Sequence, residues 1–384
     1  FFGRQSFSMA MRRSRAIFRD RGVLGKGRVR LRNTRSARDI SDGDSFRFAT
    51  GCREIPTRQH STNLRLQLPD GLSLAAKAWG EGGRPILALH GWLDNANTFH
   101  FLGPELAAKG FFVVAVDWPG HGLSSHRSKD ATYSVTDLPW YALQTVRALG
   151  WKHRFALLGH SMGAGAASLL TASCYPNEDT VTALCCIDVL APLSAPAGRT
   201  AQHLAKSFQE REKHLKRMNN ASEVNQRKTY NSFDACVEAR HQSVQALPGD
   251  QRLSLDAATY LVERGAEEIS PGKWCFRHDS RLRTPSPRYY TEEQVLAILR
   301  SITVPTLIVE ADPDAGDAWP KSATSWKARL EAVKHGQHLI LPGGHHLHLD
   351  PDTAPPVCSA VVQFYEEQAT MQEGWQDTSL ELAL

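Results

Sequence analysis

Arg154–Gly163 (RFALLGHSMG) decides the fold class, because its pattern predicts a buried strand that runs directly into a helix. Phe155–Leu158 is continuously apolar, which predicts a strand that is covered on both faces. A helix is predicted from Met162 onward. The G-x-S-x-G pentapeptide therefore lies at a sharp strand-to-helix turn, where larger side chains than glycine would collide. Such a turn strains the serine backbone and exposes its hydroxyl, so Ser161 is the candidate nucleophile.

The rest of the chain alternates strands and helices in the same way. Leu64–Leu68 and the alternation that resumes at Leu72 flank a Pro-Asp-Gly turn signal, which predicts a β-hairpin. Buried strands are predicted at residues 85–90, 111–117, 154–159, 181–189, 305–311 and 338–342, and helices between them at 137–149 and 162–175. This pattern predicts an α/β fold with a mostly parallel sheet and helices on both faces.

One long interval interrupts the alternation. Residues 194–300 are polar and helix-rich and contain no convincing buried strand, which indicates a helical cap inserted between two sheet strands. The predicted core therefore comprises residues 64–193 and 301–368, with a closing helix at 352–368. We expect residues 369–384 to be a loose tail.

Charge is distributed unevenly along the chain. The first 60 residues hold 15 Lys and Arg against 5 Asp and Glu, a net charge of +10; the whole chain has +5, which leaves −5 for residues 61–384. The folded part thus has no basic footprint for nucleic acid. The Arg- and Ser-rich start lacks periodicity, which predicts a basic, disordered segment; it also resembles a mitochondrial transit peptide, the alternative to a cytoplasmic location.

Cysteine content and hydropathy indicate the redox environment of the protein and whether a helix could span a membrane. The 7 cysteines are odd in number and irregularly spaced, which favours free thiols in a reducing compartment. No run of 18 apolar residues predicts a membrane-spanning helix.

Two further segments provide the remaining groups that acyl transfer needs. The strand at 85–89 runs into His90-Gly91-Trp92, so the Trp92 N–H is expected to join the Met162 N–H in an oxyanion hole. The last strand ends at two glycines, followed by His345, which can reach a serine at the carboxyl edge of the sheet and is the candidate base.

The acid that orients the base has two candidates. Asp314 stands three residues after the strand at 305–311, the usual spacing, and is slightly preferred. Asp188 ends the preceding strand and could serve from there. Either could instead cap a turn, as Asp often does. His121 and His160 are interpreted as structural.

These residues resemble the α/β-hydrolase superfamily and, within it, the serine-hydrolase-like family. The matching stretches are Leu89–Asn95, Pro119–Ser125, Gly159–Gly163 and His345–His348, and the resemblance covers about residues 64–368. It implies a carboxylesterase-like Ser-His-acid hydrolase. In such relatives the position of Asp314 is often not acidic, whereas an Asp matching Asp188 recurs.

The sequence thus predicts a cofactor-independent serine hydrolase that cleaves a small-molecule ester or related acyl bond. Its rivals are a lyase-like enzyme of the same fold and a catalytically weak ligand-binding protein. His346-x-His348-x-Asp350 resembles part of a dinuclear zinc motif, but no further ligands with the right spacing follow, so no metal is expected. Protein partners and the acyl-chain preference are not indicated.

Overall fold

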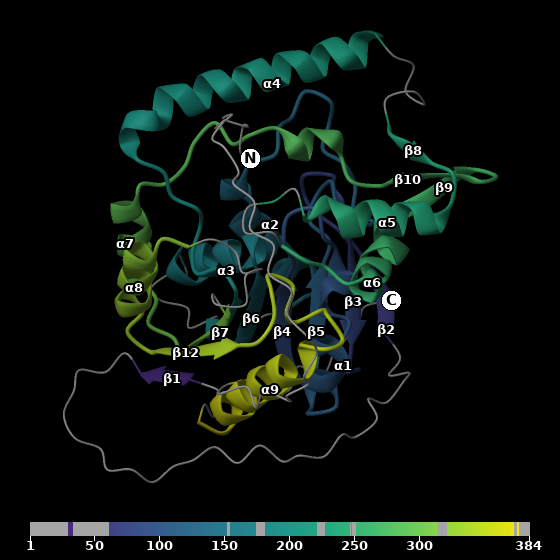
Figure 1. Ribbon diagram of the computed structural model, residues 1–384. Helices are drawn as coiled ribbons and strands as arrows, with labels where there is room; N and C mark the ends of the chain where they lie inside the picture. The colour runs from purple at the N-terminus through teal and green to yellow at the C-terminus, as the bar shows by residue number, and fades with distance from the viewer. Residues whose placement is uncertain are drawn as a thin grey trace, which may run out of the picture.

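The computed structural model describes residues 30–33, 61–151, 154–173, 181–220, 227–245, 247, 251–312, 321–371 and 375. At its centre is a nine-stranded sheet in the order β1-β12-β11-β7-β6-β4-β5-β3-β2 (Figure 1). The strands are β1 (Arg30–Asn33), β2 (Ser61–Gln67), β3 (Ser73–Trp79), β4 (Arg84–Leu89), β5 (Phe111–Val116), β6 (Phe155–His160), β7 (Val181–Ile187), β11 (Thr306–Ala311) and β12 (Gly336–Leu341).

The middle of this sheet is parallel and its edges are antiparallel. Strands β5, β4, β6, β7, β11 and β12 pair in parallel, while β1 joins β12, and β3 joins both β5 and β2, antiparallel. The β2–β3 hairpin and the mostly parallel α/β sheet were both predicted from the sequence and are confirmed.

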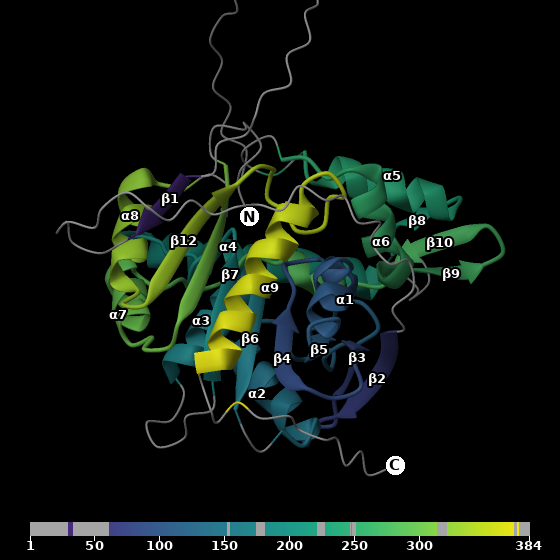
Figure 2. The same cartoon turned by 90° about the horizontal axis from the view of Figure 1, so that it is seen from below.

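Helices cover both faces of the sheet. On one face lie α2 (Leu138–Ala148), α3 (Met162–Ser173), α7 (Glu292–Arg300) and α8 (Ala323–Ala332); on the other lie α1 (Leu102–Ala107) and α9 (Ala354–Met371) (Figure 2). Successive side chains of a strand point to opposite faces. In β4, accordingly, Leu87 and Leu89 join the first core cluster, whereas Ile86 and Ala88 join the second.

The insertion between β7 and β11 is only partly helical. It contains α4 (Thr200–Asn220), α5 (Phe233–Ser243) and α6 (Leu255–Gly265), with α4 lying across the top of Figure 1. It also contains a three-stranded sheet of β8 (Thr229–Tyr230), β10 (Lys273–Phe276) and β9 (Ala266–Ser270). From the sequence we expected a helical cap without a convincing buried strand. The cap has strands in addition to its helices, but they are short, carry many exposed polar residues and so lack an apolar run.

The cap is also shorter than expected at its C-terminal end. Helix α7 contributes Val295 and Leu299 to the main core, so the segment before residue 301 already belongs to the body of the fold. A separate apolar cluster holds the cap elements together and includes Leu349 of the body. The cap therefore has its own small core, fixed to the body at Leu349.

The two ends of the described chain contain more structure than their composition indicates. Arg30–Asn33 forms β1, which pairs with β12, within a segment expected to be disordered; the rest of that segment, residues 1–29 and 34–60, lies outside the described residues. At the other end α9 reaches Met371, and Trp375 packs on Phe111 and Tyr365, with ring centroids 5.6 and 6.2 Å apart. The residues just after 368 are therefore not a loose tail.

A buried ion pair joins the cap to the body. Arg264 of α6 donates from Nε to both carboxylate oxygens of Asp117, at 3.0 and 2.8 Å. Asp117 also accepts the backbone N–H groups of Ala96 and Leu123, each at 2.8 Å. Burial nevertheless raises the pKa of Asp117, against the charge of Arg264. The loop after β5 is thus a structural junction between the cap and the body.

Among the described helices, none combines the length and the apolar character that crossing a membrane requires.

Candidate active site

Ser161 stands at the turn between β6 and α3 that the sequence predicted. Its φ of 54° lies in the left-handed region, where a non-glycine residue is strained. A side chain on Gly159 would overlap the backbone of Ala164, and one on Gly163 would overlap the carbonyl of Leu89. The two glycines therefore let the turn pack tightly, and the turn leaves the Ser161 hydroxyl at the carboxyl end of β6.

His345 meets this hydroxyl from the loop after β12. Its Nε2 lies 2.8 Å from Ser161 Oγ, and the residue is only 4% exposed. Burial lowers the pKa of His345 below its ordinary value of 6.5, although Asp188 acts in the opposite direction. The imidazole is therefore neutral near pH 7, the form that can accept a proton.

Asp188 lies on the other side of the imidazole. Its Oδ2 is 2.6 Å from His345 Nδ1, and its φ of 57° is a second strained position just after β7. The slightly preferred alternative, Asp314, lies outside the described residues. Within the described part of the chain, the carboxylate that meets His345 is that of Asp188.

Two donors hold the second oxygen of Asp188. The Ala311 N–H at the end of β11 donates to Oδ1 at 3.1 Å, and Lys321 Nζ lies 2.6 Å from the same atom. Burial alone would raise the pKa of Asp188, but the hydrogen bond and charge of His345, together with Lys321, keep it below its ordinary value. The carboxylate is thus ionised and fixed in orientation.

The loop after β4 lies beside the serine. The point where a Cβ on Gly91 would stand is 3.2 Å from Ser161 Cβ, and Leu93 has a φ of 61°. His90 braces this turn: its Nδ1 is 2.7 Å from the Gly91 carbonyl, and its Nε2 accepts the Trp118 N–H at 3.1 Å. Burial lowers the pKa of His90 to about 3, so the ring stays neutral.

Trp92 and Met162, the two residues expected to supply oxyanion donors, lie in the loop after β4 and directly after Ser161. Trp92 follows Gly91 in the loop, with its indole donating to the Leu282 carbonyl at 2.9 Å, and Met162 is the first residue of α3. Backbone N–H groups in the first turn of a helix lack intrahelical partners and carry partial positive charge. A site with a serine, a neutral imidazole, an ionised carboxylate and such amides is equipped for acyl transfer.

The comparison with protein families agrees with this geometry. The family model of the alpha/beta hydrolase fold matches residues 84–352, well over half of the chain. The chain belongs to the α/β-hydrolase fold family. Among relatives of this α/β-hydrolase, a serine hydrolase-like protein of Dictyostelium discoideum is 34% identical over 304 residues, which cover 76% of this chain and 78% of that protein.

Two further relatives extend the match. A serine hydrolase-like protein of Danio rerio is 31% identical over 330 residues, covering 82% of this chain and 91% of that protein. The crystal structure of a hypothetical protein from Pseudomonas aeruginosa matches with a TM-score of 0.68 and 35% identity, covering 79% of this chain and 99% of that one. The chain is therefore a serine hydrolase-like α/β-hydrolase, as its motifs indicated.

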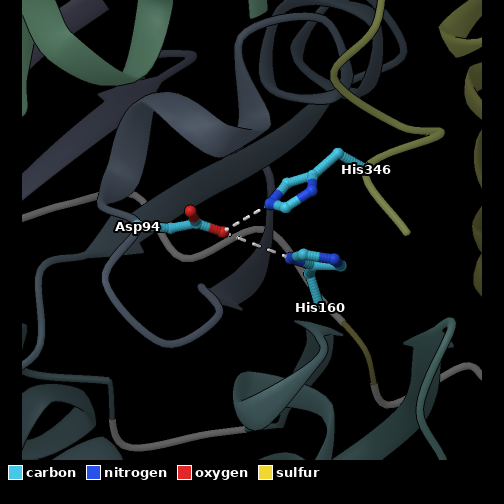
Figure 3. A group of neighbouring side chains, drawn as sticks. All are labelled: Asp94, His160 and His346. Atoms are coloured by element: carbon cyan, nitrogen blue, oxygen red, sulfur yellow. Dashed lines mark ion pairs between the residues drawn. The ribbon is translucent and has the colours of Figure 1, made fainter. Parts of the chain in front are cut away.

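A buried cluster beside Ser161 and His345 of this α/β-hydrolase has no counterpart among the predicted site residues. Figure 3 shows the carboxylate of Asp94, in the loop after β4, facing both His160 at the end of β6 and His346 in the loop after β12. Asp94 Oδ2 is 3.3 Å from His346 Nε2 and 3.6 Å from His160 Nδ1. Arg240 of α5 pairs with Asp94 Oδ1 at 2.6 Å. One carboxylate thus connects the loop after β4, the end of β6 and the loop after β12 to Arg240 of the cap.

The cluster has the donor types of a metal site. The three ligand atoms lie within 4.8 Å of one another, and imidazole with carboxylate suits zinc. It is a different set from His346-x-His348-x-Asp350, since His348 Nε2 instead lies 3.0 Å from Thr98 Oγ1. Because Arg240 already neutralises the carboxylate, we interpret the cluster as a brace between loops.

Three residues of this α/β-hydrolase site make contacts that the sequence does not indicate. His160 Nε2 lies 2.9 Å from the His345 carbonyl and so braces the backbone of the base. Asp94 and Lys321 act through contacts with residues distant in sequence. The sequence feature that points to Asp94 is its position within the stretch Leu89–Asn95, which matches the resembling family.

Proposed function

We propose that this α/β-hydrolase is a serine esterase that hydrolyses a carboxylic ester, or a related acyl bond, through an acyl-enzyme on Ser161. The proposal rests on one observation above all: the hydrogen bonds run in series from Ser161 Oγ to His345 Nε2 at 2.8 Å and from His345 Nδ1 to Asp188 Oδ2 at 2.6 Å. This is the order in which a serine, its base and its orienting acid must stand.

The chemistry proceeds in two halves. His345 takes the proton of Ser161 as the oxygen attacks the ester carbonyl, and Asp188 stabilises the resulting imidazolium. The backbone N–H groups of Met162 and Trp92 receive the developing oxyanion. His345 then protonates the departing alcohol. In the second half, water attacks the acyl-enzyme with His345 again as base, which releases the acid and restores Ser161.

The experiment that tests this proposal is ester hydrolysis by the wild type and Ser161→Ala. We expect wild-type turnover of simple aryl esters and a loss of on the order of 10⁴-fold or more in the variant, the typical effect of removing a nucleophile. The variant lacks only the hydroxyl oxygen of a partly buried residue, so we expect the fold to remain intact, which thermal unfolding checks. Retention of activity within about tenfold of wild type would mean that Ser161 is not the nucleophile.

A further inference from the structure

A large cavity lies between the cap and the body on the side of the oxyanion loop. It has a volume of about 1220 Å³ and is lined by α4, α5, α6 and β8 of the cap and by the loops that follow β4 and β5. Leu93 and Asp94 reach it from the oxyanion loop. The point where a Cβ on Gly91 would stand is 3.0 Å from Asp94 Oδ2 and 3.2 Å from Ser161 Cβ, so Gly91 is packed between this lining residue of the cavity and the serine.

The wall of the cavity is strongly basic. Seven Arg and Lys side chains line it, against two Asp side chains. By contrast, residues 61–384 as a whole carry a net charge of −5. Positive charge is therefore concentrated at the cavity rather than spread over the folded body, and clefts lined by one sign of charge attract ligands of the opposite sign.

Some of these cations are already neutralised. Arg240 pairs with Asp94, Arg281 with Asp279, Arg127 with Asp137 and Arg227 with Glu267. Lys228 and Arg283 differ, because neither forms an ion pair with a carboxylate of the described residues. Lys228 lies 4.9 Å from the Tyr230 ring centroid, and Arg283 Nη2 makes a long contact of 3.5 Å to His278 Nε2.

The cavity is consequently a place where positive charges repel one another. Burial lowers the pKa of His278 to about 3, and the charge of Arg283 adds to that effect. Partial burial of the guanidinium lowers the pKa of Arg283, although the residue as a whole is exposed, and the charge of Arg240 acts in the same direction. An anion at this position would relieve the repulsion and form charge-assisted hydrogen bonds with the guanidinium.

We propose that the cavity binds an anionic group of the substrate, a carboxylate or a phosphate, with Arg283 and Lys228 as its main contacts. The inference rests on the proposed esterase function and adds a substrate class to it: an ester whose acyl part or alcohol part carries a negative charge. The uncharged ester end lies toward Ser161, and the charged end lies under the cap.

Three matched esters test the proposal. They are phenyl butyrate, the monophenyl ester of glutaric acid, which adds a terminal carboxylate to the same chain, and the butyrate ester of 4-hydroxyphenyl phosphate, which places the charge on the leaving group. We expect kcat/KM for one anionic ester to exceed that for phenyl butyrate by about ten- to hundredfold, the contribution of one charge-assisted hydrogen bond. The better anionic ester shows which part of the substrate is charged.

The double variant Arg283→Gln/Lys228→Gln should remove this preference and leave hydrolysis of phenyl butyrate within about twofold of wild type, since neither residue contacts the triad. Arg300→Gln, which removes one positive charge from α7 away from the cavity, should keep the preference. Thermal unfolding shows whether each variant folds. Should the double variant not fold, inhibition of wild-type phenyl butyrate hydrolysis by inorganic phosphate, weakened by added KCl, supports the proposal, and lack of inhibition counts against it.

The outcomes separate the two proposals. If the wild type hydrolyses phenyl butyrate with the same kcat/KM as both anionic esters, the cavity does not select anions, while the esterase function stands. If the double variant keeps the preference of the wild type, the anion binds elsewhere. If no ester is turned over, the esterase proposal itself fails.

Discussion

Replacing Asp188 by Asn is expected to remove almost all turnover, although the two side chains have nearly the same size and shape. Asp188 Oδ1 receives two donors, the Ala311 N–H and Lys321 Nζ, while Oδ2 faces His345 Nδ1. In the variant the amide oxygen satisfies the two donors, so the NH₂ group must face Nδ1. His345 then has to accept there and carry its proton on Nε2, which points at Ser161.

That tautomer cannot take the proton of the serine. The expected loss is about 10⁴-fold in kcat, which corresponds to about 5.4 kcal/mol in activation free energy. The assay is steady-state hydrolysis of an aryl ester at pH 7, with thermal unfolding to match the stability of the variant to the wild type. A second readout is the low-field proton resonance of His345 Nδ1–H, which we expect to disappear.

Asp314→Asn is the natural control, because the spacing after β11 favours that residue. With Asp188 on the imidazole, this variant should keep turnover within a few-fold of wild type. The reasoning is refuted if Asp188→Asn retains turnover within about tenfold of wild type, or if Asp314→Asn proves the more damaging of the two.

Three further predictions follow from the surroundings of the site. Lys321→Gln removes a positive charge beside Asp188. Loss of that charge favours the protonated form of His345 and raises its pKa, so the acid limb of the pH–rate profile should move to higher pH; an unmoved limb would exclude this role. Arg264→Gln leaves Asp117 buried without its cation and should cost about 3 kcal/mol or more in the free energy of unfolding by denaturant, whereas a cost under about 1 kcal/mol would show the pair to be dispensable. Removal of residues 1–60 should leave a cooperatively folding, active enzyme in which the edge amides of β12 exchange faster; loss of soluble protein would show that this segment is needed to complete the fold.

The sequence was most informative where a local pattern determines the structure. The run that forms β6, the glycines at 159 and 163 and the helix start at Met162 predict both the turn and the position of Ser161. His345 was accessible for a similar reason, since it follows two glycines at the end of the last strand. The choice of Ser161 and the choice of His345 both depend only on residues that are adjacent in the sequence.

The acid was harder to choose, because its selection depends on packing between strands. Asp188 and Asp314 follow adjacent strands, and both could in principle reach the same edge of the sheet. What distinguishes Asp188 in the structure is its left-handed φ of 57° and the donors from Ala311 and Lys321, none of which has a sequence signature. The cap strands and β1 were missed because short, polar strands have no buried run.

The most direct test of the account is labelling by a fluorophosphonate probe followed by mass spectrometry of the intact protein and its peptides. The wild type should gain one probe per chain, on the peptide that contains Ser161, and heat-unfolded protein should gain none. Ser161→Ala should not label, and Asp188→Asn should label far more slowly than the wild type. A folded wild-type protein that remains unlabelled, or an adduct on any other residue, would contradict the claim that Ser161 is an activated nucleophile.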